Sequence, residues 1–253
     1  LVIAAGLDPV ELIPRPWSVT APVVYCGVWP VPTDHVPFVV QLLMDVAAGI
    51  GEIDGMLVRS DWTREQVSPN VVDQRQQILP PASGLTAQQV IQVAASRLAA
   101  SSRVTVDAGA HMFPATMLWP VREPNGMLIS NGLSTMGFAL PAAIGAALID
   151  RERPVVALTG DGGLLMCAGE LVTAAREGLP IIVIVFDDAS LSLIEIKQQA
   201  RQFKPSGVGL APIDWPALAR SMGLSAFAAG SEAELDQAIE RALGCSGPSL
   251  IDA

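Results

Sequence analysis

The sequence predicts an α/β fold: a parallel β-sheet with helices on both faces, preceded by a fragment of a second α/β domain. Two runs, PVVALT at 154–159 and IIVIVF at 181–186, are continuously apolar rather than alternating, and helical patterns separate them. Such runs are typical of strands in a parallel sheet whose two faces are both covered. Apolar residues make up 51% of the chain and charged residues 16%, which is enough apolar surface for a core and argues against disorder.

The first part of the chain has too few elements for a complete domain. An apolar run at 1–6 and a second at 21–28 predict strands, and residues 36–50 predict a helix. Two strands and one helix do not enclose a core, so we interpret residues 1–65 as the C-terminal part of a central α/β domain. Residues 66–85 are polar and contain three prolines, a composition that predicts a linker.

Residues 86–253 form the second predicted domain, in which helices and strands alternate. In chain order we expect a helix at 86–100, a strand at 103–106, a helix from 135, a strand at 154–159, a helix at 168–177, a strand at 181–186, helices at 191–202 and 231–243, and a strand at 249–251.

Met136–Ile149 contains no charge, but its fourteen residues are fewer than the roughly 20 that cross a bilayer. Its small side chains indicate a buried interface helix.

Charge and cysteine content exclude several classes of partner. A net charge of −10 argues against nucleic acid, because binding to phosphates depends on Lys and Arg. The three cysteines have no metal-ligand spacing, so we expect free thiols in a reducing compartment. The sequence starts with no charged region followed by an apolar one, which argues against a signal peptide. We therefore expect a cytoplasmic protein with no membrane partner.

Two successive core strands end in acidic residues. The first runs into Gly160-Asp161-Gly162-Gly163, and the second runs into Asp187-Asp188. Asp188 follows Asp161 by 27 residues, enough for one helix and one strand, so neighbouring strands would deliver both carboxylates to one edge. Carboxylate oxygens suit Mg²⁺, which takes further ligands from phosphates and water, and the glycines let backbone N–H groups approach a phosphate. The pattern predicts a metal-diphosphate site.

Two other interpretations of these residues remain open. The aspartates could simply cap the helices that follow the strands, because Asp is common at such positions. A dinucleotide site is a further alternative, although GDGGLL lacks the third glycine of the G-x-G-x-x-G pattern.

The motifs resemble those of thiamine-diphosphate enzymes, and of acetolactate synthase-like members in particular. The resemblance lies in the GDG, the interval of just under 30 residues and the closing Asp187-Asp188, where the family usually has Asn-Asn. SNGLSTMGFALPAAIGAA at 130–147 resembles the matching helix start, and DAGAH at 107–111 resembles a D-x-G-x-H segment. The resemblance implies the thiamine-diphosphate-binding fold for 86–253 and the end of the central domain for 1–65.

The resemblance also implies a role for each matching position. Asp161, the Asp188 side chain and the Ser190 carbonyl would bind Mg²⁺. Met136 would be the apolar fulcrum that bends the cofactor into a V shape, with the backbone at Ser134 and Met136 holding its aminopyrimidine ring. The remaining cofactor-binding positions that we predict are Gly109, His111, Gly162, Gly163 and Leu191.

Some positions depart from the family pattern. Asp188 adds a negative charge where Asn is usual, so we expect a stronger dependence on Mg²⁺ than an Asp188→Asn variant would show. Leu193, Ile194 and Lys197 would face the substrate. Related decarboxylases have an acidic residue at the position of Ile194, so an apolar residue favours carboligation, whereas Lys197 stands where acetolactate synthases usually have Trp.

The predicted function is decarboxylation and carboligation of a 2-oxo acid with thiamine diphosphate and Mg²⁺. The activating Glu of the family lies on a pyrimidine-binding domain, which we expect on another segment or chain, so that this chain alone would not turn over. A homodimer or homotetramer is expected, and FAD binding is left open. The alternatives are a non-catalytic relative that serves as a binding or assembly module, and a dinucleotide-binding oxidoreductase.

Overall fold

The computed structural model describes residues 1–7, 17–34, 36–77, 84–98, 100 and 102–253. The chain forms two compact units, Leu1–Val67 and Ser68–Ala253, called unit 1 and unit 2 below. The boundary falls within helix α2 (Arg64–Gln77), although the sequence predicts a linker from residue 66. At the start of the helix the Thr63 N–H donates to Gln66 Oε1, which is one of the two hydrogen bonds of a capping box. The end of the predicted linker, at 78–83, lies outside the described residues.

Unit 1 contains three parallel strands in the order β1-β2-β3, followed by a helix. Its elements are β1 (Val2–Ala5), β2 (Val23–Gly27), β3 (Phe38–Leu43) and α1 (Val46–Asp54). The core of the unit is small: Ala4, Val23, Tyr25 and Val36 are buried, and the Tyr25 ring lies 5.4 Å from that of Phe38.

The helix predicted over residues 36–50 is wrong in its first part. Phe38–Leu43 pairs with β2 as a strand, and its β-branched Val39 and Val40 suit an extended backbone. The helix begins only after Asp45, whose carboxylate accepts a hydrogen bond from the Ala48 N–H as an N-cap. Unit 1 therefore has one strand more than the sequence predicts.

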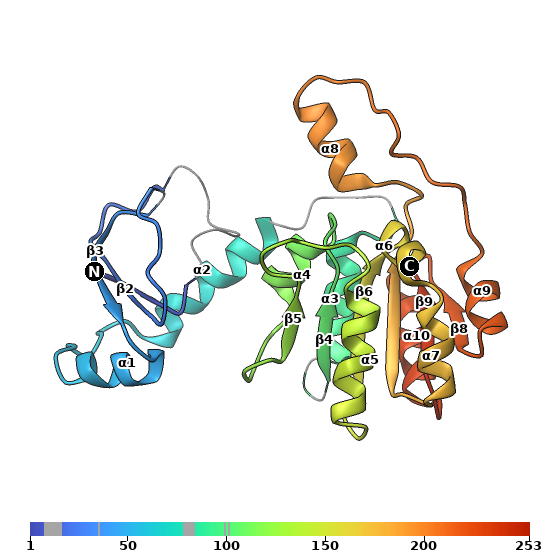
Figure 1. Ribbon diagram of the computed structural model, residues 1–253, viewed down its shortest axis with the longest axis horizontal. Coiled ribbons are helices and arrows are strands. Elements are labelled where there is room, and N and C mark those ends of the chain that lie inside the picture. The colour runs from blue at the N-terminus through green and yellow to red at the C-terminus, as the bar shows by residue number, and fades with distance from the viewer. Residues whose placement is uncertain (8–16, 35, 78–83, 99, 101) are drawn as a thin grey trace. The chain divides into compact units, whose positions relative to one another are not determined.

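Unit 2 is built on a six-stranded sheet in which every pair of neighbouring strands is parallel, in the order β5-β4-β6-β7-β9-β8 (Figure 1). The strands are β4 (Arg103–Val106), β5 (Met127–Ile129), β6 (Val155–Gly160), β7 (Ile181–Phe186), β8 (Ser225–Ala228) and β9 (Ser249–Asp252). The helices are α3 (Ala87–Leu98), α4 (Met112–Leu118), α5 (Ala139–Ile149), α6 (Asp161–Cys167), α7 (Glu170–Arg176), α8 (Ser192–Ala200), α9 (Trp215–Ser221) and α10 (Glu232–Leu243). The predicted α/β class with a parallel sheet is confirmed.

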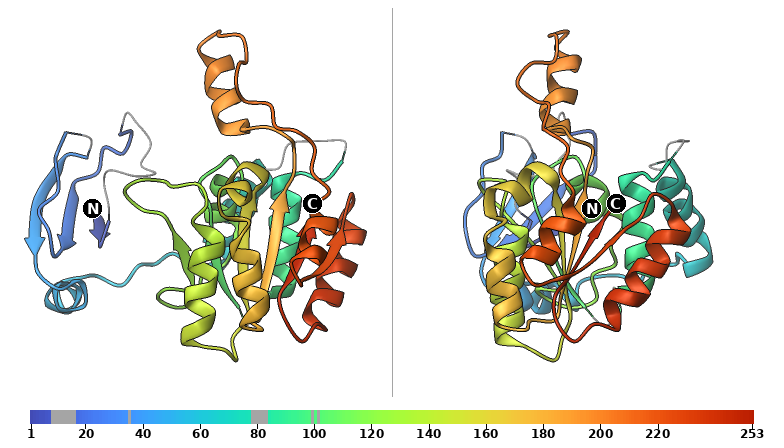
Figure 2. Two further views of the ribbon diagram at one scale, coloured as in Figure 1. Left: turned by 45° about the vertical axis from the view of Figure 1, so that its right-hand side comes forward. Right: turned by 90° about the vertical axis from the view of Figure 1, so that its right-hand side faces the viewer.

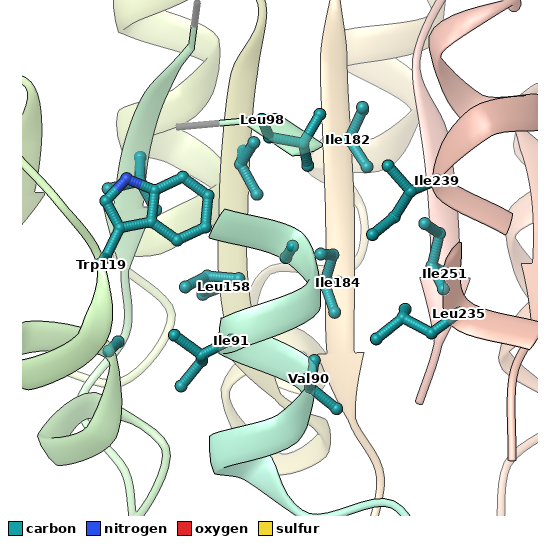
Figure 3. Packing of buried hydrophobic residues seen from close by; sticks show 14 of the residues in the cluster. Val90, Ile91, Leu98, Trp119, Leu158, Ile182, Ile184, Leu235, Ile239 and Ile251 are labelled. Carbon is teal, nitrogen blue, oxygen red and sulfur yellow. The ribbon is translucent and has the colours of Figure 1, made fainter. Parts of the chain in front are cut away.

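Helices cover both faces of this sheet (Figure 2). Successive residues of β6 and β7 point to opposite faces, so that Val156 and Leu158 join one core cluster while Val155 and Ala157 join the other. Figure 3 shows the first cluster, to which α3 and α10 contribute Val90, Ile91, Leu98, Leu235 and Ile239. The continuous apolar runs in the sequence follow from this arrangement, because each strand is buried on both sides.

Helix α5 starts later than the sequence predicts. The helix begins at Ala139 rather than at Thr135, because the chain makes a turn at Ser134–Gly137 with positive φ at both ends of the turn. Four of its alanines are buried in the second core cluster against the sheet of the same unit: Ala139, Ala143, Ala146 and Ala147. Gly145, Leu148 and Ile149 on the same helix are exposed, so an interface on its outer face stays a prediction.

Two further predictions concern the cysteines and a membrane span. All three cysteines are free thiols, and Cys26 is buried. Each helix in the part of the chain that the structure describes is too short or too polar to cross a lipid bilayer.

Candidate functional site

A cleft of about 260 Å³ lies where β4 and β6 end. The chain leaves β4 toward β5 on one side and returns to β6 on the other, so the strand order reverses between these two strands. In open parallel sheets, ligands bind outside the carboxyl ends of the strands at such a reversal. All predicted site residues except Asp161 and Lys197 line this cleft: Gly109, His111, Ser134, Met136, Gly162, Gly163, Asp188, Ser190, Leu191, Leu193 and Ile194.

Asp107, directly after β4, organises one wall of the cleft. Its buried carboxylate accepts hydrogen bonds from the N–H groups of Gly137 (3.2 Å), Phe138 (2.6 Å) and Ala139 (2.6 Å). The Thr159 hydroxyl on β6 donates a fourth, at 2.6 Å. Burial raises the pKa of Asp107, and these four hydrogen bonds oppose the rise. Asp107 thus ties the first turn of α5 to the ends of β4 and β6.

The turn before α5 carries Met136 into the cleft. Ser134 and Gly137 have φ of 47° and 73°, a left-handed conformation that is unusual for Ser. The turn is fixed by the Ser130 hydroxyl, which accepts from the Thr135 N–H at 3.1 Å. A Cβ built on Gly162 would lie 3.1 Å from the Met136 Cε and 2.6 Å from Leu191 Cδ2, so a larger residue there would push the ends of these two side chains aside.

Asp161, the first residue of α6, is buried and incompletely paired. Its Oδ1 accepts a hydrogen bond from the Gly162 N–H at 2.6 Å, while Oδ2 is buried with no hydrogen-bond partner among the described residues. Burial, together with the charges of Asp188 and Asp187, raises the pKa of Asp161 to about 6. Gly162 was predicted to donate to a diphosphate, and in this structure its N–H faces Asp161 instead.

The loop after β7 presents the second carboxylate. β6 and β7 are adjacent and parallel, with Gly160 opposite Phe186, so that Asp161 and Asp187-Asp188 emerge at the same edge of the sheet. Asp188 accepts hydrogen bonds from the Ser190 N–H (3.1 Å) and from the Ser192 hydroxyl. Between them, Ala189 has a positive φ of 54°, a strained backbone of the kind found at functional sites.

The segment after α8 holds this loop in place. Leu210 N–H donates to the Ala189 carbonyl and Leu191 N–H donates to the Val208 carbonyl, each at 2.8 Å. Ser190 pairs with Gly209 as an isolated β-bridge. The loop that carries Asp188 is therefore fixed from both sides.

His111 forms part of the floor of the cleft. The imidazole is buried and stacks on the Phe186 ring, with centroids 4.8 Å apart and planes 11° apart. Burial lowers the pKa of His111 to about 4, despite a hydrogen bond with the Leu158 backbone, so the ring is neutral near pH 7. Its Nε2 has no hydrogen-bond partner within the described ranges.

The substrate-side residues lie on the first turns of α8. Leu193 and Ile194 line the cleft and give that side an apolar surface. Lys197 lies one turn further along the helix, exposed and outside the cleft lining. Glu195 accepts hydrogen bonds from the Ser190 hydroxyl (2.8 Å) and from the Gln199 amide (3.0 Å), which connects α8 to the Asp188 loop.

Sequence reasoning missed three residues of this site. It gave no role to Asp107, to Phe186 beneath His111, or to Ser192, which donates to Asp188. The signal for Asp107 was present, because an Asp that directly follows a buried strand and precedes a glycine must find hydrogen-bond donors. The contacts of Phe186 and Ser192 depend on the loop conformation and leave no pattern in the sequence.

The described residues of the cleft offer few protein ligands for a metal ion. No three His, Cys, Asp or Glu side chains gather into a metal-binding group within the described ranges. The unpaired, buried Oδ2 of Asp161 next to the charge of Asp188 is nevertheless a place where a cation would relieve both desolvation and repulsion. The residues fit a hard divalent cation that takes its remaining ligands from phosphate and water.

The fold and the cleft together give the class of the protein. It is an α/β protein with a ligand cleft at the carboxyl edge of its sheet, where the strand order reverses. Comparison with known proteins then identifies the family. Residues 107–253 match the family described as "Thiamine pyrophosphate enzyme, C-terminal TPP binding domain". The chain therefore belongs to the thiamine pyrophosphate enzymes, as its motifs predict.

Several relatives are acetolactate synthases. The chain is 32% identical to the catabolic acetolactate synthase of Raoultella terrigena, in an alignment that covers 99% of this chain and 47% of that protein. It is 30% identical to the acetolactate synthase of Bacillus subtilis (strain 168), covering 100% and 46%. Against the large subunit of acetolactate synthase isozyme 1 from Escherichia coli (strain K12), it is 35% identical over 58% of this chain and 27% of the relative. The chain thus spans about half the length of the first two relatives.

Proposed function

We propose that this chain binds thiamine diphosphate through Mg²⁺ and takes part in decarboxylation and carboligation of a 2-oxo acid. The observation that carries the proposal is the meeting of Asp161 and Asp188 at the ends of neighbouring strands, where one carboxylate oxygen is buried without a partner. Membership of the thiamine pyrophosphate enzymes and similarity to acetolactate synthases support the same reaction class.

Three groups of this chain would hold the metal. Asp161 and Asp188 offer carboxylate oxygens, and Ser190 offers its backbone carbonyl beside them. Mg²⁺ commonly uses one or two carboxylates and completes its shell with phosphate oxygens and water. Bound there, the ion would offset the repulsion that raises the pKa of Asp161.

The chain's other residues would position the cofactor and keep its reactive end dry. When bound, thiamine diphosphate supplies the nucleophilic carbon and the electron sink for loss of CO₂. Met136 and Gly162, in close contact, would shape the floor on which the cofactor bends. Leu193 and Ile194 would cover the reactive end with apolar surface and hold no acidic proton there, which favours attack on a second carbonyl over protonation.

A second subunit would complete the site. Among the described residues, those that line the cleft include no Glu. We propose that the activating carboxylate comes from a pyrimidine-binding domain of the same or another subunit, as in the family that the chain belongs to. Exposed apolar side chains near the cleft support such a contact: Phe113, Met117, Leu133 and Met166 are all at least 39% exposed. We propose a homodimer or homotetramer on this basis.

The Asp188→Asn variant tests the contribution of the second carboxylate. Asp188 adds a negative charge beside the diphosphate, so the wild type should depend on Mg²⁺ more steeply than the variant does. Titration of Mg²⁺ at fixed thiamine diphosphate, followed by cofactor fluorescence quenching, measures both midpoints. Equal midpoints would remove the argument for a special role of Asp188.

Turnover by the assembled enzyme tests the reaction itself. Release of CO₂ from pyruvate should require both thiamine diphosphate and Mg²⁺, and the carbon product should be a ligated hydroxy-ketone rather than a free aldehyde. An assembled enzyme that binds the cofactor and releases no CO₂ from any 2-oxo acid would instead be a non-catalytic binding module. Reduction of a nicotinamide cofactor would indicate an oxidoreductase.

A further inference from the structure

Helix α8 is unlike the other helices of unit 2. It buries none of its side chains and stands away from the sheet in both Figure 1 and Figure 2. Among its residues, only those of the N-terminal end line the cleft: Ser192, Leu193 and Ile194. An exposed helix that begins at a ligand cleft can offer side chains to the outer part of a substrate.

Positive charge is concentrated on this helix and directly after it. The chain has two lysines, Lys197 and Lys204, and both lie here with Arg201 between them. Elsewhere in unit 2, arginines such as Arg97 and Arg151 pair with carboxylates. Within the described ranges, Lys197, Arg201 and Lys204 form no ion pair, and all three are exposed. Arg122 is likewise exposed and forms no ion pair among the described residues, so what sets these three cations apart is that they are neighbours at the end of one helix.

Two of these cations continue the face of α8 that lines the cleft. Residues four apart in a helix lie on the same face, so Leu193, Lys197 and Arg201 form one row. At 1.5 Å per residue, Lys197 lies about 6 Å and Arg201 about 12 Å beyond Leu193 along the axis. The row leads from an apolar cleft wall to two positive charges. Arg201 is the C-cap of α8, and its N–H still donates to the Lys197 carbonyl, so it stays in the row. Lys204 does not continue it, because Gln202, beyond the cap, has a positive φ of 59°.

The acidic residue of the helix does not neutralise this row. Glu195 precedes Lys197 by two residues, which places it on a different side of the helix. Its two oxygens accept hydrogen bonds from Ser190 and Gln199. Asp188, which with Asp161 forms the proposed metal site, accepts a hydrogen bond from the Ser192 hydroxyl at the N-terminal end of α8, the end of the helix away from Arg201. The charges of Lys197 and Arg201 are therefore available to a ligand.

We propose that Lys197 and Arg201 bind a second anionic group on the donor substrate, so that the substrate is a 2-oxo acid with a distal carboxylate. The first carboxylate of such an acid leaves as CO₂ at the apolar end of the cleft. Its carbon chain lies along Leu193 and Ile194, and the second carboxylate reaches the cations one turn further out. Arg and Lys bind carboxylates by charge-assisted hydrogen bonds. This inference rests on the proposed function and adds the class of substrate to it.

A matched pair of probes tests the inference. 2-Oxoglutarate and 2-oxopentanoate have equal chain length and differ in a terminal carboxylate against a methyl group. The wild-type assembled enzyme with thiamine diphosphate and Mg²⁺ should release CO₂ from 2-oxoglutarate with a kcat/KM at least tenfold higher than from 2-oxopentanoate. Equal values, or a preference for 2-oxopentanoate, would overturn the inference.

Variants of the three cations test whether the preference for 2-oxoglutarate comes from the row of Lys197 and Arg201. Lys197→Ala should lower the ratio of the two kcat/KM values about tenfold, chiefly through KM for 2-oxoglutarate, and Lys197→Arg should restore most of it. Lys204→Ala makes the same change in net charge off the row, so it should leave both substrates unchanged. If Lys204→Ala lowered the ratio as much as Lys197→Ala, a general field rather than a binding site would be responsible, and the inference would be wrong.

Binding measurements separate this inference from the proposed function. Calorimetric titration with each probe should show tighter binding of 2-oxoglutarate, and Lys197→Glu should abolish the difference, whether or not CO₂ is released. If neither probe were turned over, the proposed reaction would be contradicted. The difference in binding between the two probes would still test whether Lys197 and Arg201 form an anion site. Saturable Mg²⁺-dependent binding of thiamine diphosphate together with equal binding of both probes would contradict the anion site alone.

Discussion

Two buried carboxylates stand at the ends of adjacent strands, and they differ in how their oxygens are used. Asp107, after β4, accepts four hydrogen bonds from Thr159 and from three backbone N–H groups. Asp161, after β6, accepts one hydrogen bond from its neighbour Gly162 and leaves Oδ2 without a partner among the described residues. Burial raises the pKa of both.

The difference separates a structural role from a ligand-binding role. A buried carboxylate with four donors holds elements together, because removing it leaves all the donors unsatisfied. A buried carboxylate with an unused oxygen destabilises the fold unless a cation joins it. Asp107 therefore positions the turn that carries Met136, whereas Asp161 is the carboxylate that we propose as a metal ligand.

The largest effect should come from Asp107→Ala. The variant leaves the N–H groups of Gly137, Phe138 and Ala139 and the Thr159 hydroxyl without an acceptor, so we expect the free energy of unfolding to fall by about 3–5 kcal/mol. Urea unfolding followed by circular dichroism measures it. Thr159→Val removes one of the four donors and should cost only about 1 kcal/mol.

Asp161→Ala is the matched control for this comparison. In the absence of metal it removes a carboxylate that is buried with an unused oxygen, so its free energy of unfolding should change little or rise. If Asp161→Ala destabilised the metal-free protein as much as Asp107→Ala, the two carboxylates would have the same role and the distinction would be lost.

His111 extends the comparison, because it too has a buried atom without a partner. Its pKa is lowered from 6.5 to about 4 in the folded chain, so the unfolded chain binds the proton more tightly. This contribution to stability is complete above about pH 6.5 and is lost as the pH falls toward 4, on the order of 3 kcal/mol in all. His111→Gln should remove that part of the pH dependence.

Thermal or urea unfolding of wild type and His111→Gln between pH 4 and 7 measures the difference. Asp161 acts in the opposite direction, because its raised pKa favours the folded state as the pH falls, and it is present in both proteins. The stability of the wild type relative to His111→Gln should therefore fall by about 3 kcal/mol as the pH falls from 7 to 4. Parallel curves would show that His111 does not become harder to protonate on folding.

A smaller effect should come from Gly163→Ala. A Cβ there would overlap Asp107 Oδ2 and lie 3.0 Å from the Thr159 hydroxyl, and both are held by their mutual hydrogen bond. We expect a loss of about 2 kcal/mol from this overpacking. Gly169→Ala is the control, because a Cβ there meets nothing within 4 Å and the backbone is already helical. Equal stabilities of the two variants would mean that Asp107 can move.

Much of unit 2 could be predicted from the sequence, because the determining patterns are local. The apolar runs at 154–159 and 181–186 became β6 and β7, and Ser231 begins α10 as its N-cap, accepting from the Glu234 N–H. The acidic residues after β6 and β7 were predicted to share an edge, and the adjacency of the two strands confirms that they do.

The rest depends on contacts between residues far apart in the sequence. The start of α5 at Ala139 is set by Asp107, 32 residues earlier. Short strands such as β5 (Met127–Ile129) and β8 (Ser225–Ala228) form because a neighbouring strand offers an edge, and their few residues carry no clear period. The burial of His111, at the start of α4, likewise depends on Phe186, the last residue of β7.

Calorimetric titration of the protein with thiamine diphosphate, in Mg²⁺ and in EDTA, tests the central claim most directly. Wild type should bind saturably with Mg²⁺ and at least 100-fold more weakly without it, and Asp161→Ala should bind as weakly in Mg²⁺ as wild type does in EDTA. Equal affinity of wild type in Mg²⁺ and in EDTA, or full affinity in Asp161→Ala, would contradict a metal-diphosphate site at the ends of β6 and β7.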